Sequence, residues 1–389
     1  MGSCIRPSGK ERDTDSAAVE VRVEDLSEEA AVWADSVAND MDTLQLAAQV
    51  MMPAVFASDD EWTLRRVKEY AARGIGGIIL LKGDAHGAKA IADSMIRNGD
   101  VYPFVAVDAE WGLGMRLSDA PRYPANGKLG EDVDEQLMYD YGYEVARECR
   151  QVGINMVLGP VLDVNGTAGI MGMRSFGSDP GRVTSLGLSY ARGLEDGGVM
   201  SVAKHFPGQG SVGKDTHSGK GVVNRSLHMM DSVDLQPFRE WSKVGLGGVM
   251  VGHLAVPAID GTMLPAAVSP VVIRDLLIRD LGFTGLVFTD AMNMGGAEGH
   301  GADLALMAGA HLIVAPRDTE QEISRIIQAI RTGKVSIEEL RARIGHILFY
   351  KYLLRLRDNS NITASPGSGT TFNLRTPYTD SLRQRLISP

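Results

Sequence analysis

Ionisable side chains follow several short apolar runs of this 389-residue sequence, and their types suit proton transfer, nucleophilic attack or metal binding. The candidates at these positions are Asp108 and Glu110, Asp163, Lys204 and His205, His253, and Asp290. If the runs are strands of a parallel barrel, these residues all lie at the mouth where barrel active sites are found. Packing gives no reason for so many charges at strand ends, so we expect them to form a site.

Asp290 directly follows the apolar run GLVFT, so its carboxylate is expected to point into the mouth of the barrel. A carboxylate there can attack an anomeric carbon and form a glycosyl-enzyme, or it can ligate a metal. It can also cap a following helix. The residue and its position leave these three roles open.

The longest chemically informative string is KHFPGQGSVGKDTH, from Lys204 to His217. A strand ends here in a cation and an imidazole, and a Gly-rich loop then carries Asp215 and a second imidazole, His217. A carboxylate two residues from an imidazole can fix its tautomer and raise its basicity, which suits a general acid and base. A solvated Asp and a surface His are the alternative reading of this spacing.

Eight short stretches rich in Val, Ile and Gly supply the elements that must position these residues. They begin near Val50, Gly76, Pro103, Ile154, Val199, Gly248, Gly285 and Ala310. Each is nearly continuous in apolar character and is followed by a longer segment with helical spacing. This alternation predicts parallel strands covered on both faces, and eight in series predict a (β/α)8 TIM barrel.

Three intervening segments place apolar residues at spacings of three and four, which indicates helices: EDVDEQLMYDYGYEVARECRQVG, PVVIRDLLIRDLGF and TEQEISRIIQAIRTGKVS. Gly282 and Gly333 stand where helices should end. SEEAAVWADSVANDMD predicts a helix before the barrel with Ser27 as its N-cap. SIEELRARIGHILFYKYLLRLR predicts a closing helix, capped by Ser336 in a capping box with Glu339.

The expected organisation is a flexible tail over residues 1–25, the catalytic barrel over 26–357, and a linker and tail over 358–389. The Gly/Ser/Thr-rich linker leads into TPYTDSLRQRLISP, which has weak helical character. A helix that packs on nothing would be a docking tail or would lead into a partner domain absent from this chain.

Composition narrows the partners and the compartment. The net charge of −10 comes from scattered acids, with no block of Lys and Arg, so no nucleic-acid partner is expected. Of the two cysteines, Cys149 is expected to be a small buried hydrophobe. The start Met-Gly-Ser-Cys resembles a processed bacterial lipoprotein, which would place a lipid anchor on Cys4 and the chain in the cell envelope. A plain cytosolic start or a cloning scar, with a cytoplasmic chain, fits equally.

KHFPGxG followed by Asp-x-His, with TDAMNMGG downstream, resembles family 3 glycoside hydrolases, in particular the bacterial β-N-acetylglucosaminidase branch. DAEWGLGMRL, GPVLDVN and RSFGSDP are similar to further segments of the family, so the resemblance extends from about Leu46 to Leu354. Trp111 departs from the family pattern by standing where Gly is common, and Met173 by standing where Asn is usual. Trp111 could stack on a sugar or fill core space.

The resemblance implies a retaining, exo-acting enzyme without metal or cofactor that hydrolyses terminal β-linked N-acetylglucosamine, with peptidoglycan fragments as the expected source. It implies Asp290 as nucleophile and the Asp215/His217 pair as acid and base. It assigns the binding of sugar hydroxyls to a further set of residues: Asp108, Arg116, Arg174, Lys204 and His205.

Three other functions stay open at the level of sequence. A neutral imidazole repels phosphate less than a carboxylate would, so a related β-glycosidase or phosphorylase fits the motif. A metal-dependent barrel enzyme could use a set of ligands that consists of His205, His217, His253, Asp108 and Asp290, or a Schiff-base enzyme could use Lys204. A non-catalytic sugar-binding barrel is the third alternative.

Overall fold

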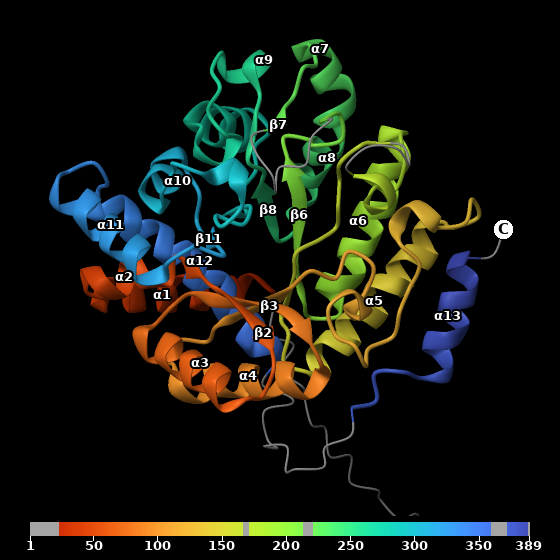
Figure 1. The fold of residues 1–389 in the computed structure, drawn as a ribbon, viewed down its shortest axis with the longest axis horizontal. Helices are drawn as coiled ribbons and strands as arrows, with labels where there is room; N and C mark the ends of the chain where they lie inside the picture. Colours follow the sequence, from red (N-terminus) through yellow and green to blue (C-terminus); the bar gives the residue numbers. More distant parts are fainter. Residues whose placement is uncertain (1–22, 166–170, 213–220, 359–371, 388–389) are drawn as a thin grey trace, which may run out of the picture.

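The computed structural model describes residues 23–165, 171–212, 221–358 and 372–387, and parallel strands form its centre (Figure 1). Seven strands pair in the order β10-β8-β6-β5-β4-β3-β2. They are β2 (Ala54–Ala57), β3 (Gly77–Gly83), β4 (Phe104–Val107), β5 (Met156–Val157), β6 (Met200–Phe206), β8 (Gly248–Val251) and β10 (Leu286–Thr289).

Two short strands close this sheet into a ring. Phe288 of β10 bridges to Leu312, next to β11 (Ile313–Val314), and β11 pairs in parallel with β1 (Met51–Met52). Strand β1 continues into β2 after Pro53, so the ring has eight strand positions. The predicted (β/α)8 barrel is confirmed, and each of the eight apolar stretches contributes one strand position.

Helices cover the outside of the ring (Figure 1). They are α2 (Thr43–Gln49), α3 (Glu61–Arg73), α4 (Ala85–Asn98), α5 (Glu135–Gln151), α6 (Pro180–Asp196), α7 (Leu227–Met229), α8 (Gln236–Val244), α9 (Pro257–Asp260), α10 (Ala302–Ala308) and α11 (Thr319–Arg331). Helices cover the outer face of the strands, and the inner face lines the barrel, so the strands are buried on both sides. Every residue of β4, β6, β8 and β10 is buried. This burial explains why the strands read as nearly continuous apolar runs.

The helices that precede and close the barrel differ in part from the prediction. Helix α1 spans Val23–Asp40, so Ser27 lies inside it and the predicted N-cap at Ser27 is wrong. The residues before Ser27 are compatible with a helix, which therefore starts earlier. Helix α12 (Ile337–Asp358) begins as predicted, with the Glu339 amide donating to Ser336 Oγ at 3.2 Å. The Glu339 carboxylate lies 3.6 Å from Arg274.

Gly282 and Gly333 end helices as predicted, because each adopts the left-handed conformation that side chains disfavour (φ 68° and 71°). The helix before Gly282, η6 (Val271–Asp280), is π-helical. Apolar spacing in the sequence does not distinguish this wider turn from an α-helix.

Of the two alternatives for the C-terminal helix, the structure shows the docking tail, because the helix packs on the barrel itself. Helix α13 (Pro377–Ile387) lies beside α5, and Leu382 and Leu386 on it are fully buried (Figure 1). The hydroxyl of Thr379 on α13 donates to Glu144 Oε1 on α5 at 2.6 Å. The tail is therefore docked on the outside of the barrel.

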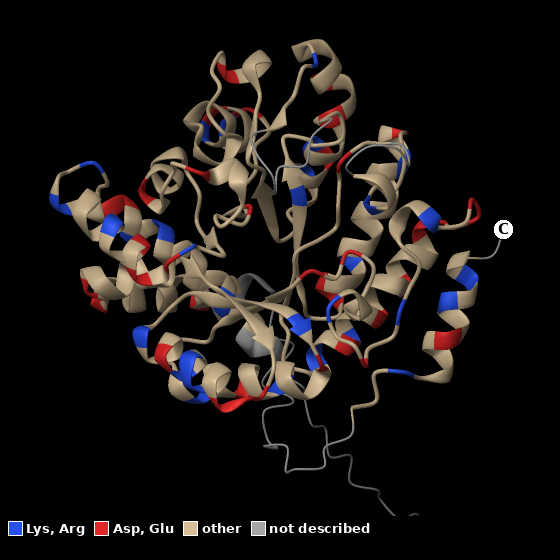
Figure 2. Cartoon of the chain, in the orientation of Figure 1, with Lys and Arg blue, Asp and Glu red and all other residues tan. Residues whose placement is uncertain are grey.

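Charged residues of both signs are interspersed over the outer helices (Figure 2). Cys149 is fully buried in α5, as predicted. Cys4 lies outside the described residues. Within the described ranges, no helix combines the length and apolar character that crossing a bilayer requires.

Candidate active site

A pocket of about 420 Å³ opens at the carboxyl ends of the strands. Its wall contains Ala54 of β2, Ile79 of β3, Lys204 of β6 and Met250 of β8, with Asp290 directly after β10. This volume lies within the range of roughly 300–1,000 Å³ that is typical of small-molecule sites. The pocket is therefore large enough for a ligand and lies where barrel enzymes bind their substrates.

Two carboxylates and three cations form a continuous network in this pocket. The ammonium group of Lys204 lies 2.7 Å from both Asp108 and Glu110. Arg174 donates to Glu110 through two nitrogens, at 2.9 and 2.7 Å, and Arg116 pairs with Asp108. Because these bonds are charge-assisted, the network fixes the side chains firmly.

The network keeps its members ionised although Glu110 and Lys204 are buried and Asp108 is largely so. Burial would raise the pKa of Asp108, but Lys204 and Arg116 hold that pKa below its ordinary value. Burial likewise opposes ionisation of Glu110, and Lys204 and Arg174 hold the pKa of Glu110 below its usual range. Burial would lower the pKa of Lys204, yet the two carboxylates raise it. The pocket thus presents fixed charges to polar groups of a ligand.

His205 is held by a second carboxylate. Its Nδ1 lies 2.7 Å from Asp163 Oδ2, and its Nε2 accepts from Arg174 Nη2 at 3.3 Å. Asp163 also accepts the backbone amides of His205, at 3.2 Å, and Gln209, at 2.6 Å. Asp163 therefore orients the imidazole and the start of the loop that follows β6.

Strand β6 places two successive residues in the pocket. Side chains of a regular strand alternate between faces, so Lys204 and His205 would normally point to opposite sides. The register with β8 shifts here, because Lys204 pairs with Met250 and Phe206 with Val251. This irregularity lets both Lys204 and His205 line the pocket.

Asp290 lies at the end of β10, where its backbone is held on both sides. Its amide donates to the Val251 carbonyl at 2.9 Å, and its carbonyl accepts from His253 Nε2 at 3.0 Å. Its Oδ1 accepts the Ala291 amide at 2.8 Å. The next α-helix, α10, begins only at Ala302, so capping is not the role of Asp290. Asp290 is one of the residues that line the pocket.

The predicted catalytic and sugar-binding residues that lie in the described part of the chain come together in this one pocket: Asp108, Arg116, Arg174, Lys204, His205 and Asp290. Asp163 and His253 were also expected at the mouth but do not line the pocket; they contact His205 and the Asp290 carbonyl from behind it. Asp215 and His217 lie outside the described residues. Trp111, left open between stacking and core packing, lines the pocket and is half-buried.

Sequence reasoning noted Glu110 and Asp163 at strand ends but gave neither a role. Glu110 joins Lys204 to Arg174, and Asp163 orients His205. The sequence did carry a signal for these two partners. The predicted sugar-binding residues contain more cations than carboxylates, and buried charges require partners of opposite sign.

The geometry bears on two of the alternative chemistries. Imine formation needs a neutral amine, whereas the carboxylates around Lys204 stabilise its ammonium form. Among the described residues, no group of three or more His, Cys, Asp or Glu side chains is arranged to hold a metal ion. His217, which that alternative also invoked, is not among them.

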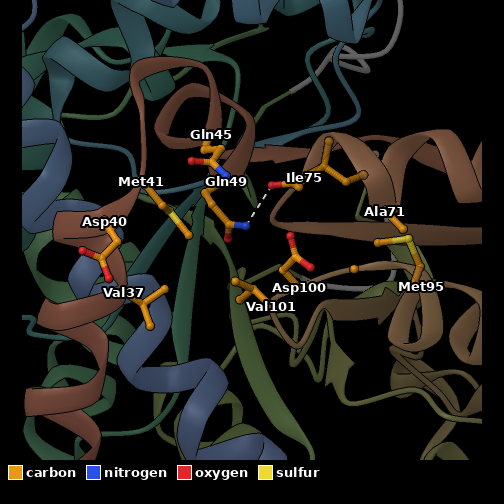
Figure 3. Close-up of a pocket in the computed structure, with 12 residues that line it drawn as sticks. Val37, Asp40, Met41, Gln45, Gln49, Ala71, Ile75, Met95, Asp100 and Val101 are labelled. Carbon is orange, nitrogen blue, oxygen red and sulfur yellow. Dashed lines mark hydrogen bonds between the residues drawn. The ribbon is translucent and has the colours of Figure 1, made fainter.

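A second cavity, of about 200 Å³, lies at the opposite end of the barrel (Figure 3). Its lining includes Gln49, Ile75 and Val101, which precede β1, β3 and β4. The side-chain amide of Gln49 donates from Nε2 to the Gly74 carbonyl at 2.8 Å. None of the predicted site residues lines this cavity, so the chemistry is expected at the other end.

Comparison with known proteins agrees with this architecture. Residues 42–349 match the family model described as the glycosyl hydrolase family 3 N terminal domain. A β-hexosaminidase of Chromobacterium violaceum is 34% identical over 263 residues, which cover 64% of this chain and 73% of the relative. A β-hexosaminidase of Nitrosospira multiformis is 33% identical over 265 residues, covering 63% and 74%.

The fold is similar to a solved family 3 β-N-acetylglucosaminidase from Paenibacillus sp.. The two superpose with a TM-score of 0.78 at 28% identity, over 89% of this chain and 68% of that one. Sequence and structure therefore point to the same family.

Proposed function

The chain belongs to glycosyl hydrolase family 3, and on that premise we propose that it is a retaining, exo-acting β-N-acetylglucosaminidase. Membership makes the chain a glycoside hydrolase with a carbohydrate substrate. Terminal β-linked N-acetylglucosamine is the proposed sugar, because the relatives are β-hexosaminidases and the structural neighbour is a β-N-acetylglucosaminidase. Peptidoglycan fragments are the proposed source.

One observation carries the proposal: the pocket combines the Asp290 carboxylate with the fixed charges of Asp108, Lys204 and Arg174. Charged groups that are already oriented bind sugar hydroxyls through strong hydrogen bonds at little cost in reorganisation. We assign these groups, with Arg116 and His205, to the terminal sugar. Such binding would present the anomeric carbon to Asp290.

In the proposed first step, Asp290 Oδ2 forms a bond to the anomeric carbon while the glycosidic bond breaks. Oδ1 accepts the Ala291 amide, which leaves Oδ2 for attack. His217 gives its proton to the departing oxygen, and Asp215 orients the imidazole. In the second step His217 takes a proton from water, the water oxygen bonds to the anomeric carbon, and the ester to Asp290 breaks.

A panel of aryl glycosides tests the proposal. The β-N-acetylglucosaminide should be cleaved faster than the β-glucoside and β-galactoside. Asp290→Asn should lower kcat by at least about a thousandfold, as loss of a covalent nucleophile does. His217→Ala should slow aryl substrates with good leaving groups less than natural glycans, since good leaving groups need less protonation.

Asp231→Asn, which alters an exposed partner of Arg239, is the matched control and should act like the unchanged protein. Full activity of Asp290→Asn would refute the mechanism. Binding of the sugar without turnover would instead support a sugar-binding barrel.

A further inference from the structure

The docked C-terminal segment, residues 372–387, comprises a short stretch that is neither helix nor strand, followed by helix α13; we name it the C-terminal brace. Arg147 of α5 donates to the carbonyls of Asn373, at 2.8 Å, and Leu374, at 2.9 Å. Leu382 and Leu386 are both fully buried. Apolar burial and specific hydrogen bonds together indicate a built interface with the barrel.

The brace also contacts the 119–130 segment, which connects the β4 loop to α5. The Gly130 amide donates to the Leu386 carbonyl at 3.1 Å, and Arg383 donates to the Arg122 carbonyl. Within the same segment, the hydroxyl of Tyr123 donates to Glu148 of α5 at 2.6 Å. The 119–130 segment is thus held jointly by α5 and by the brace.

The far side of the 119–130 segment reaches the backbone of Arg174, a residue that lines the pocket. Asn126, which is 3% exposed, donates to the carbonyl of Arg174 at 2.7 Å. A Cβ at Gly127 would lie 3.1 Å from Met173 Cα, so the two backbones are in close contact. Arg174 is therefore supported twice: Asn126 holds its main chain and Glu110 holds its guanidinium.

We propose that the C-terminal brace is a positioning element for Arg174, acting through the 119–130 segment and Asn126. The assignment of Arg174 to a sugar hydroxyl rests on the proposed function. Undocking the brace frees one side of the segment, so Arg174 samples more positions and binding of the terminal sugar costs more. The brace then belongs to the working site although it does not touch the pocket.

The test undocks α13 in the full-length chain with Leu382→Ala and Leu386→Ala together. KM for the aryl β-N-acetylglucosaminide should rise about two- to tenfold, with a smaller change in kcat. Ile387→Ala is the matched control, because that side chain is on the same helix and 59% exposed. Asn126→Ala should reproduce the rise, and combining it with the double change should add little, since both act on one path.

Hydrogen exchange supplies a readout that does not depend on the substrate. The Arg174 amide, which donates to the Met171 carbonyl at 2.7 Å, should exchange faster when α13 is undocked, while barrel amides keep their protection. Where the double variant does not fold, Arg383→Ala removes the contact with the Arg122 carbonyl, together with a 3.5 Å contact to Asp380 on the same helix. It should raise both KM and the exchange rate of the Arg174 amide.

An undocked α13 with unchanged KM and unchanged exchange at Arg174 would overturn the proposal. Fully additive effects on KM of undocking the brace and of Asn126→Ala would also overturn it. If the unmodified enzyme does not cleave the aryl glycoside, the proposed function fails, and exchange at Arg174 still decides whether the brace positions this residue.

Discussion

Buried charges in the pocket depend on one another, and Glu110 is the central member. It is 3% exposed and contacts both Lys204 and Arg174. Removing one partner of a buried ion pair costs far more than the pair contributes to stability, because the remaining charge is left without compensation. The effect of a change at Glu110 should therefore appear in the residues that it orients.

Glu110→Gln should lower kcat/KM by about 30-fold or more, since truncating one partner of a buried charge pair costs about 2–5 kcal/mol. The shape of the side chain is kept, so the loss reports charge. Kinetics on the aryl glycoside measure it. Glu240→Gln, at an exposed pair with Lys243, is the control and should be silent. Equal activity of both variants would contradict the dependence of the site on Glu110.

Trp111 lines the pocket and is half-buried, which favours stacking on the substrate over core packing. Trp111→Ala should raise KM about two- to tenfold, the range expected for one aromatic contact, with little change in Tm. Trp62, 62% exposed and outside the lining of the pocket, gives the control Trp62→Ala. A large fall in Tm with unchanged KM would assign Trp111 to the core.

At the residue scale, the sequence predicted which side chains gather and missed how they pair. Asp108, Lys204 and Asp290 were predicted because each ends an apolar run. The contact between Glu110 and Arg174 joins residues 64 positions apart. Such pairing depends on strand register and loop paths, which sequence patterns do not specify.

At the scale of elements, the loop after β5 and the loop after β6 are joined by Asp163. Its carboxylate is fully buried and accepts three N–H groups, two from His205 and one from Gln209. Asp163→Asn replaces one acceptor oxygen by a donor, so at least one of these bonds must be lost. Hydrogen bonds to a charged group contribute about 1.5–3 kcal/mol, so kcat/KM should fall about 10- to 100-fold.

Asp60→Asn is the matched control, because Asp60 caps α3 after β2 and Asn caps helices equally well. Its activity should match that of the unchanged protein. An Asp163→Asn enzyme with normal kcat/KM would show that the site orients His205 without this carboxylate.

The elements themselves were largely predictable, because a strand covered on both faces needs a continuous apolar run. The N-terminal boundary of α1 was not, since Ser27 suits a helix interior as well as a cap once the preceding residues are helical. Pro53 separates β1 from β2, and it lacks an amide for the ladder. Boundaries of this kind are where local patterns are weakest.

At the scale of the molecule, contacts distant in sequence were not predictable. Arg147 and Leu374, which help to dock the brace, are 227 positions apart. The short tail helix carries too weak an apolar pattern to identify its partner. The surface on which it docks can therefore be identified only in the folded barrel.

A pair of imidazoles joins the barrel to its closing helix and makes stability depend on pH. Nδ1 of His311, beside β11, accepts the Val287 amide at 3.1 Å, and its Nε2 lies 3.1 Å from Nδ1 of His346 on α12. Burial, together with His346 and Arg343, keeps the pKa of His311 well below its ordinary value. Burial also lowers the pKa of His346.

Because these folded-state pKa values lie below that of an unfolded His, near 6.5, the unfolded chain binds more protons once the pH falls below about 6.5. Stability is then lost as the pH drops toward the lowered values. His311→Asn keeps an acceptor for the Val287 amide without titrating. Its Tm should therefore fall less than that of the unchanged protein between about pH 7.5 and pH 5.5, by about 2–4 °C. The control is His228→Asn, at an exposed position, which should leave the pH dependence of Tm unchanged. If Tm falls equally with pH in all three proteins, the His pair is not the cause.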